Sequence, residues 1–129
     1  KTIAIGRYAL SSGTLLSNNV AIGDSALKVL GVTTGTLNDS NVAVGVDAGA
    51  VLVDGQQNVF IGHEAANLLT TGSYNIIIGP LTGQYLYTGS GIISIGGDNI
   101  IDGLDNQVNI GSVFYYDGTG YSWISSKRG

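Results

Sequence analysis

The chain has 129 residues, among them 21 glycines, 1 proline and no cysteine, which excludes a disulfide framework and a thiolate metal site. Apolar residues reach 43% and charged residues only 11%, the reverse of a disordered chain, and no apolar run approaches the roughly 20 residues of a transmembrane helix, so we expect a folded chain without membrane insertion. The net charge is −4 and no Lys or Arg occurs between Val29 and Ser126, which excludes nucleic-acid binding and disfavours anionic lipid.

A short phrase that ends in glycine recurs along the chain, starting with "TIAIG" at residues 2–6. Because the chain starts inside this phrase, we interpret it as a piece of a longer protein or as a processed product. The intervals between the closing glycines are 17, 22, 17, 17, 17 and 15 residues. Such regular spacing indicates one structural unit copied along the chain. The glycines, which we expect to form structural corners, are Gly6, Gly23, Gly45, Gly62, Gly79, Gly96 and Gly111.

Two positions in each phrase, one and three residues before the glycine, are always Val or Ile. β-Branched residues two apart point to the same face of a strand, so each phrase predicts a short strand with one aliphatic face. We expect this face to form the structural core. After the first pair, Ile3 and Ile5, its members are Val20, Ile22, Val42, Val44, Val59, Ile61, Ile76, Ile78, Ile93, Ile95, Val108 and Ile110.

Between the strands lie corner and turn signals. Asparagine precedes four strands, at positions 19, 41, 58 and 75, where it favours turn formation, with a ladder of stacked side chains as the alternative. Phrases such as "TTG" at residues 70–72 indicate further turns. Each repeat therefore predicts a strand, a glycine corner, a second short extended segment and a turn. This is one coil of an all-β β-solenoid or β-roll.

Both faces of the expected strands carry apolar residues, because the residue between the two aliphatic positions is often Ala, Phe or Ile. One thin coil encloses only one strip of side chains, so burial on both faces favours packing against further copies of the chain. The sequence alone does not fix the number of copies.

The run "NVAIGDSAL", followed by "TTG", "NVAVG" and "NVFIGHEAANLLTTGSYNIIIG", resembles the repeats of bacteriophage tail-fibre and related host-attachment proteins. It is also similar to the shorter repeats in the heads of trimeric autotransporter adhesins. The resemblance covers roughly residues 2–111, and Ile92 in place of Asn and Pro80 depart from it. It implies an extended homotrimeric β-fibre, intertwined or side by side, in a virion or outside the cell. The interval of 17 and the "TTG" turns favour the phage fibre.

The C-terminal end differs from the repeats. Two aromatic runs, "VFYY" and "YSWI", flank the turn signal "DGTG" at residues 117–120 and predict a β-hairpin. We therefore divide the chain into a repeat region, residues 1–111, and an aromatic hairpin or cap, residues 112–129. Its rings either cover the open end of the core or bind a receptor or cell-surface glycan by stacking. The residues concerned are Tyr115, Tyr116, Tyr121 and Trp123.

Few side chains suggest chemistry. Asp98, Asp102 and Asp105 in "GGDNIIDGLDN" are candidate calcium ligands, but their spacing matches no common calcium loop, so polar turns are the simpler interpretation. His63 is the one histidine in the sequence, and it is expected to be a solvated corner residue. We expect no catalytic residues, no cofactor and no enzyme.

The sequence as a whole predicts a structural segment of a trimeric phage-type tail fibre that spaces or presents a host-recognition surface. Its expected partners are itself, other fibre or virion proteins and a cell-surface glycan. The alternative is a bacterial surface adhesin or an extracellular filament subunit. A fibre-borne polysaccharide-degrading enzyme is a third possibility, but it needs carboxylates gathered in a groove, and the sequence shows no convincing set.

Overall fold

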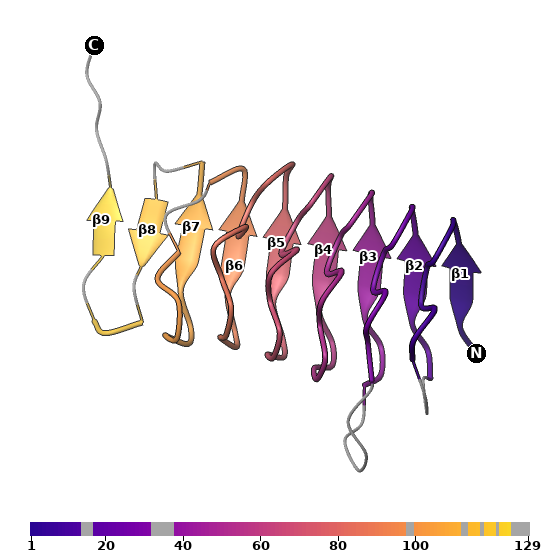
Figure 1. The fold of residues 1–129 in the computed structure, drawn as a ribbon. Helices are drawn as coiled ribbons and strands as arrows, with labels where there is room; N and C mark the ends of the chain where they lie inside the picture. Colours follow the sequence, from indigo (N-terminus) through magenta and orange to yellow (C-terminus); the bar gives the residue numbers. More distant parts are fainter. Residues whose placement is uncertain are drawn as a thin grey trace.

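The computed structural model is an all-β solenoid in which successive coils stack along one axis (Figure 1). It describes residues 1–13, 17–31, 38–97, 100–111, 114–116, 118–120 and 122–124. One sheet contains all nine strands in chain order, and no described segment is helical. The strands are β1 (Ile3–Ile5), β2 (Val20–Ile22), β3 (Val42–Val44), β4 (Val59–Ile61), β5 (Ile76–Ile78), β6 (Ile93–Ile95), β7 (Val108–Ile110), β8 (Phe114–Tyr116) and β9 (Ser122–Ile124).

Strands β1 to β7 are parallel and keep one register along the stack. Val20 pairs with Val42 across the 22-residue coil, and Ile93 pairs with Val108 across the 15-residue coil. A change in coil length therefore leaves the sheet unbroken. At a strand spacing of about 4.8 Å, the six steps from β1 to β7 span roughly 29 Å.

The expected C-terminal hairpin is present in the backbone. Strand β8 runs antiparallel to β7, with Asn109 opposite Tyr115, and β9 runs antiparallel to β8, with Tyr115 opposite Trp123. The strand pairing thus changes from parallel to antiparallel where the aromatic runs begin. The division into two regions at residue 111 stays a prediction.

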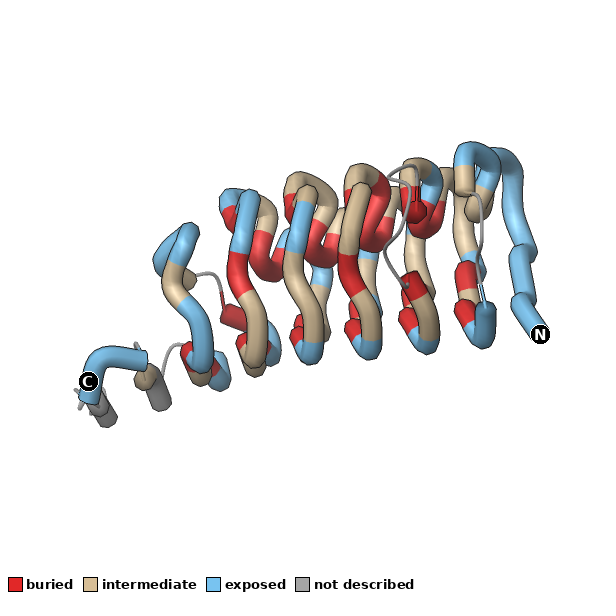
Figure 2. Tube along the Cα trace, turned by 90° about the horizontal axis from the view of Figure 1, so that it is seen from below, coloured by how far each residue is buried: buried red, intermediate tan, exposed pale blue. Residues whose placement is uncertain are grey.

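The interior of the coil is lined by the middle residue of each strand, which is fully buried in β2 to β7 (Figure 2). A column of leucines from the opposite wall completes the core. The middle strand residues are Ala21, Ala43, Phe60, Ile77, Ser94 and Asn109, and the leucines are Leu30, Leu52, Leu69 and Leu86. The inside of the coil is narrow and is filled by Ala21 and Ala43 in the earlier coils and by Phe60 and Ile77 in the middle ones, together with the leucines.

The prediction that the aliphatic positions form the core is wrong for the single chain. A spacing of two shows that two side chains share a face, but it does not say which face is inside. The leucines fill the interior, so the paired Val and Ile side chains point outward and are half-buried or exposed. This holds for Val20, Ile22, Val42, Val44, Val59, Ile61, Ile76, Ile78, Ile93, Ile95, Val108 and Ile110.

The glycine after each strand lies in a stacked corner. All seven corner glycines have positive φ, which is +130 to +139° from Gly6 to Gly79. A Cβ on Gly6, Gly23, Gly45 or Gly62 would overlap the carbonyl group of the next glycine in the column. Glycine is therefore required there by both the backbone angle and the close approach of the next coil. At Gly96 and Gly111, by contrast, a Cβ would meet nothing within 4 Å.

After the corner, the chain does not form the expected extended segment. It makes two short turns in which residues two and four positions past the glycine adopt positive φ, as Ser25 and Leu27 do (58 and 47°) and as Glu64 and Ala66 do (55 and 51°). Residues other than Gly, Asn and Asp seldom adopt a left-handed backbone conformation, so the residue types at these positions did not predict the turns. Extended pairing returns only at Asp54, Thr71 and Thr88, which form isolated parallel bridges in the described chain.

A ladder of buried asparagines runs beside the strands, where the sequence favoured simple turns. Asn41 Nδ2 donates to Asn19 Oδ1 (3.1 Å), and Asn58 Nδ2 donates to Asn41 Oδ1 (2.9 Å). Each amide group also donates to a main-chain carbonyl, as Asn58 Nδ2 does to Gly72 O (2.9 Å). Asn75 is the last asparagine of the ladder, and its Oδ1 accepts a hydrogen bond from the main-chain N–H of Ile92 (2.9 Å). Because the side chains are buried and bonded, the ladder ties each coil to the next.

Candidate functional site

The outward face of the parallel sheet is a continuous aliphatic surface, which we name the aliphatic stripe. It consists of the two Val or Ile residues on each of the strands β1 to β7. Seven of its isoleucines are 37–59% exposed. The stripe contains no polar side chain, and it follows the coil axis over roughly 29 Å. An exposed apolar surface of this length is unusual on a protein that stays alone in water.

Two columns of mostly polar residues border the stripe. One precedes the strands by two positions, is exposed and has left-handed backbone; it comprises Asn18, Ser40, Gln57, Tyr74 and Asn106. The other follows the corner glycines and comprises Arg7, Asp24, Val46, His63 and Pro80. Together the stripe and its borders have an apolar centre and a mixed, mainly polar rim. This is the composition of protein interfaces in general.

A polar groove with a volume of about 330 Å³ lies on another part of the surface. Its lining residues are Asp54, Thr71, Gly72, Ser73, Thr88, Gly89, Ser90, Gly103 and Asp105. The phrase "TGS", repeated 17 residues apart at 71 and 88, is the sequence signal for this groove, but by itself it indicates only a turn.

Main-chain groups hold the side chains of this groove. Ser73 Oγ accepts from the N–H of Gln56 (3.1 Å), and Ser90 Oγ accepts from the N–H of Ser73 (3.1 Å). The column ends at Asp105, whose Oδ1 accepts from the N–H of Ser90 (2.7 Å). The lining offers oxygen atoms and two carboxylates without a lysine or arginine, which suits a hydrated or hydroxyl-bearing molecule better than an anion.

Two of the calcium candidates, Asp102 and Asp105, accept hydrogen bonds from main-chain N–H groups at the 15-residue coil. Asp102 Oδ1 accepts from the N–H groups of Tyr87 (2.8 Å) and Thr88 (2.7 Å), as Asp105 does from Ser90. Asp98 lies outside the described residues. In the part of the chain that the structure describes, no three His, Asp or Glu side chains gather as a metal site. Asp102 and Asp105 thus bind main-chain groups of the preceding coil.

His63 lies at an exposed corner, with its Nε2 3.5 Å from Glu64 Oε1. Glu64 Oε2 also accepts a hydrogen bond from Asn67 Nδ2 (3.2 Å). The three residues form a local surface contact beside the rim of the stripe.

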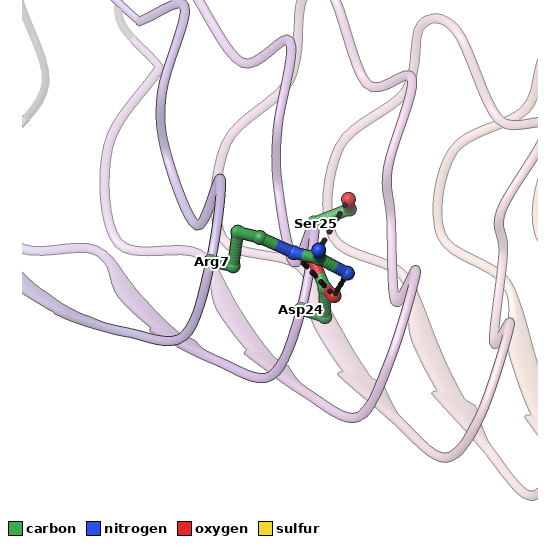
Figure 3. A network of polar contacts seen from close by, with 3 residues as sticks. All are labelled: Arg7, Asp24 and Ser25. Atoms are coloured by element: carbon green, nitrogen blue, oxygen red, sulfur yellow. Dashed lines mark hydrogen bonds and ion pairs between the residues drawn. The ribbon is translucent and has the colours of Figure 1, made fainter.

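An ion pair between Arg7 and Asp24 lies at the first corner. Arg7 donates to Asp24 Oδ2 from Nε (3.1 Å) and from Nη2 (2.6 Å), and Ser25 donates to Asp24 Oδ1 (Figure 3). The hydrogen bond from Arg7 lowers the pKa of the Asp24 carboxyl, and the bond to Asp24 raises the pKa of Arg7. Arg7 and Lys28 also lie 5.6 and 5.7 Å from the Tyr8 ring centroid. These contacts join the first coil to the second.

The predicted aromatic site is described only in part. Tyr115 and Trp123 are paired across the hairpin backbone, and Tyr116 is half-buried. Tyr121 lies outside the described residues. Receptor or glycan binding by these rings stays a prediction.

Comparison with known proteins found no family model, no curated protein and no solved structure that matches this chain. Among the described residues there is also no helix with the length and apolar character needed to cross a membrane.

Proposed function

We propose that this chain is a structural segment of a homotrimeric fibre of the phage tail-fibre type, which spaces or presents a host-recognition surface on a virion. The observation that supports this proposal is the unbroken coil stack from β1 to β7, in which six parallel pairings keep one register. A stack of this kind lengthens by one strand spacing for each repeat, so it suits a rod.

The internal bonds suit an element that carries mechanical load. Bonds of two kinds join successive coils: the asparagine ladder, as in Asn58 to Asn41, and main-chain bonds, as in Val59 N–H to Asn75 O. Such networks stiffen a structure because every member is bonded on both sides. No residue of the chain is proposed as catalytic.

The alternative proposal is a bacterial surface adhesin or an extracellular filament subunit. The exposed aliphatic stripe also fits this alternative, because it suits packing of copies without fixing their number.

The native mass, measured by light scattering during size-exclusion chromatography, tests these proposals. A single species with three times the mass of 13.2 kDa supports the trimeric fibre segment. A ladder of masses that grows with concentration supports the filament subunit. A monomer at every concentration contradicts both.

A further inference from the structure

We infer that the polar groove binds a short neutral saccharide along the flank of the solenoid. The sugar hydroxyls bond to side-chain oxygens that successive coils place in a row, beside an exposed tyrosine. The inference goes beyond the proposed fibre segment, because a spacer needs no ligand site on its flank, and it holds for any number of chains. It also differs from the predicted aromatic site, since the groove belongs to the repeat region.

The first support is the row of side chains in the groove. Asp54 pairs with Thr71, and Thr71 pairs with Thr88, as parallel bridges between three successive coils. At a strand spacing of about 4.8 Å, the row extends over roughly 10 Å. Carboxylate oxygens accept hydrogen bonds, and hydroxyl groups both donate and accept them. A row of such groups suits a ligand that carries hydroxyl groups along its length, which is the chemistry of a saccharide.

The second support is the hydrogen-bonding capacity that the groove leaves open. Ser73 Oγ and Ser90 Oγ each accept a main-chain N–H at 3.1 Å, so their O–H groups remain as donors. Asp105 uses Oδ1 for the N–H of Ser90, so its Oδ2 remains as an acceptor. Within the described part of the chain, the Asp54 carboxylate and the Thr71 hydroxyl bind no other protein group. The main-chain bonds hold the serines in place, so a ligand meets oriented groups and loses less entropy on ordering them.

The third support is charge, which selects a neutral ligand. The groove has two carboxylates, on Asp54 and Asp105, and the sequence has no lysine or arginine from 29 to 126. A sialylated, sulfated or phosphorylated sugar would bring its own negative charge to this surface, and like charges placed together oppose binding. A neutral sugar hydroxyl, in contrast, donates a stronger hydrogen bond to a carboxylate than to an uncharged acceptor.

Spacing and size favour a saccharide over a metal ion. Asp54 precedes β4 and Asp105 precedes β7, so three strand steps separate them. Their main chains are therefore roughly 14 Å apart along the axis, whereas calcium ligands lie about 2.3–2.6 Å from the ion. The two carboxylates thus lie at opposite ends of the groove and do not share one cation. The groove volume of about 330 Å³ is at the lower end of the range of about 300–1,000 Å³ for small-molecule sites, which suits a short saccharide.

The fourth support is Tyr87, which directly precedes Thr88 of the groove. Its neighbour Leu86 is buried in the core, whereas Tyr87 itself is 47% exposed. Asp102 Oδ1 accepts from the N–H groups of both Tyr87 (2.8 Å) and Thr88 (2.7 Å), which fixes the backbone between the ring and the groove. The apolar face of a tyrosine ring can stack against the C–H face of a sugar ring. Tyr87 therefore supplies a stacking surface beside the row of hydrogen-bonding groups.

A glycan array, followed by isothermal titration calorimetry, tests this inference. The array carries neutral oligosaccharides of hexoses and N-acetylhexosamines together with their sialylated and sulfated counterparts. The neutral oligosaccharide that binds most strongly is then titrated into the protein. We expect neutral sugars to bind, their acidic counterparts to bind about ten times more weakly, and EDTA to leave binding unchanged.

Two variants with matched controls locate the site. Thr71→Val removes one hydroxyl and should weaken binding about fivefold, and Tyr87→Ala removes the ring and should weaken binding about tenfold. The controls, Thr2→Val and Tyr74→Ala, change an exposed threonine and an exposed tyrosine outside the groove, so they should bind as the wild type does. All four side chains are exposed, so thermal melts should show all four variants folded.

The remaining outcomes overturn the inference. If no neutral sugar binds, or if only acidic sugars bind, the groove is not a site for neutral saccharides. Binding that EDTA abolishes would assign the groove to a metal ion. Wild-type affinity of both Thr71→Val and Tyr87→Ala would place the sugar elsewhere on the chain. None of these outcomes bears on the proposed fibre, which the native mass tests separately.

Discussion

Asn58 donates a hydrogen bond to Asn41 across 2.9 Å, from one coil to the coil before it, and both side chains are fully buried. The same Nδ2 donates to Gly72 O at 2.9 Å, and Asn58 Oδ1 accepts from the N–H of Asn75 at 3.0 Å. One amide group thus joins three successive coils. It supplies hydrogen bonds to main-chain groups of the neighbouring coils, as buried polar groups require.

Replacement of Asn58 by alanine should lower the free energy of unfolding by about 3 kcal/mol, because a buried partner left without a bond costs about 1–3 kcal/mol and two partners, Gly72 O and the N–H of Asn75, lose theirs. Asn41 Oδ1 keeps the main-chain N–H of residue 58 as a donor. Urea denaturation measures the change. Gln57→Ala is the matched control, since that side chain is exposed, and it should change the free energy by less than about 0.5 kcal/mol. Equal effects of the two variants would mean that the ladder adds nothing.

Asn58→Asp should make stability depend on pH. Burial raises the pKa of the introduced carboxyl above its unfolded value of about 3.9. A raised pKa in the folded state gives the greatest stability below the unfolded value, and stability is lost as pH rises through the folded value. The variant should therefore melt at a lower temperature at pH 7 than at pH 4, relative to the wild type. Parallel melting curves at the two pH values would contradict the buried position.

Gly62→Ala should prevent folding or lower the yield of folded protein severely. The new Cβ would overlap the carbonyl of Gly79, and the backbone there has a φ of +136°. Gly111→Ala is the control, since a Cβ at that corner meets nothing within 4 Å and φ is +57°, so a cost of only about 1–2 kcal/mol is expected. Circular dichroism and thermal melts distinguish the two, and similar behaviour would refute the stacked-corner argument.

Gly49 and Phe60 should be coupled. A Cβ on Gly49 would lie 2.5 Å from the Phe60 ring, so Gly49→Ala should overpack the core at a cost of about 1–3 kcal/mol in addition to the strain of its positive φ. Phe60→Leu frees space at this contact, so the double variant should be more stable than the sum of the single effects predicts. A double-mutant cycle by urea unfolding measures the coupling, and strict additivity would show that the ring moves aside freely.

Loss of the Arg7–Asp24 ion pair should have little effect on stability, because the Arg7 side chain is 74% exposed and solvent screens the pair. The pKa of Asp24 is lowered in the folded chain, so the contribution of the pair is present above the ordinary value of 3.8 and is lost as pH falls through the lowered value. Arg7→Ala should therefore leave the melting temperature unchanged between about pH 5 and 8. A clear drop at neutral pH that high salt abolishes would show that the pair matters.

The sequence by itself determined the repeat, the strands and the corners. The alternation of Val or Ile around one residue predicted seven short strands, and each is found at that place, because β-branched spacing of two depends only on local backbone geometry. The glycines were also readable, since positive φ admits few other residues.

The tertiary structure decided which face of the strands is inside. Ile61 and Phe60 are neighbours of similar character in the sequence, and only the leucine column across the coil places Phe60 inside and Ile61 outside. Likewise, the sequence favoured a turn at each asparagine, whereas the ladder depends on Asn41 and Asn58 lying one above the other in successive coils. The spacing of residues in the sequence determines the local backbone structure. Which face of a strand is buried, and which side chains stack, depends on the side chains that other coils place against them.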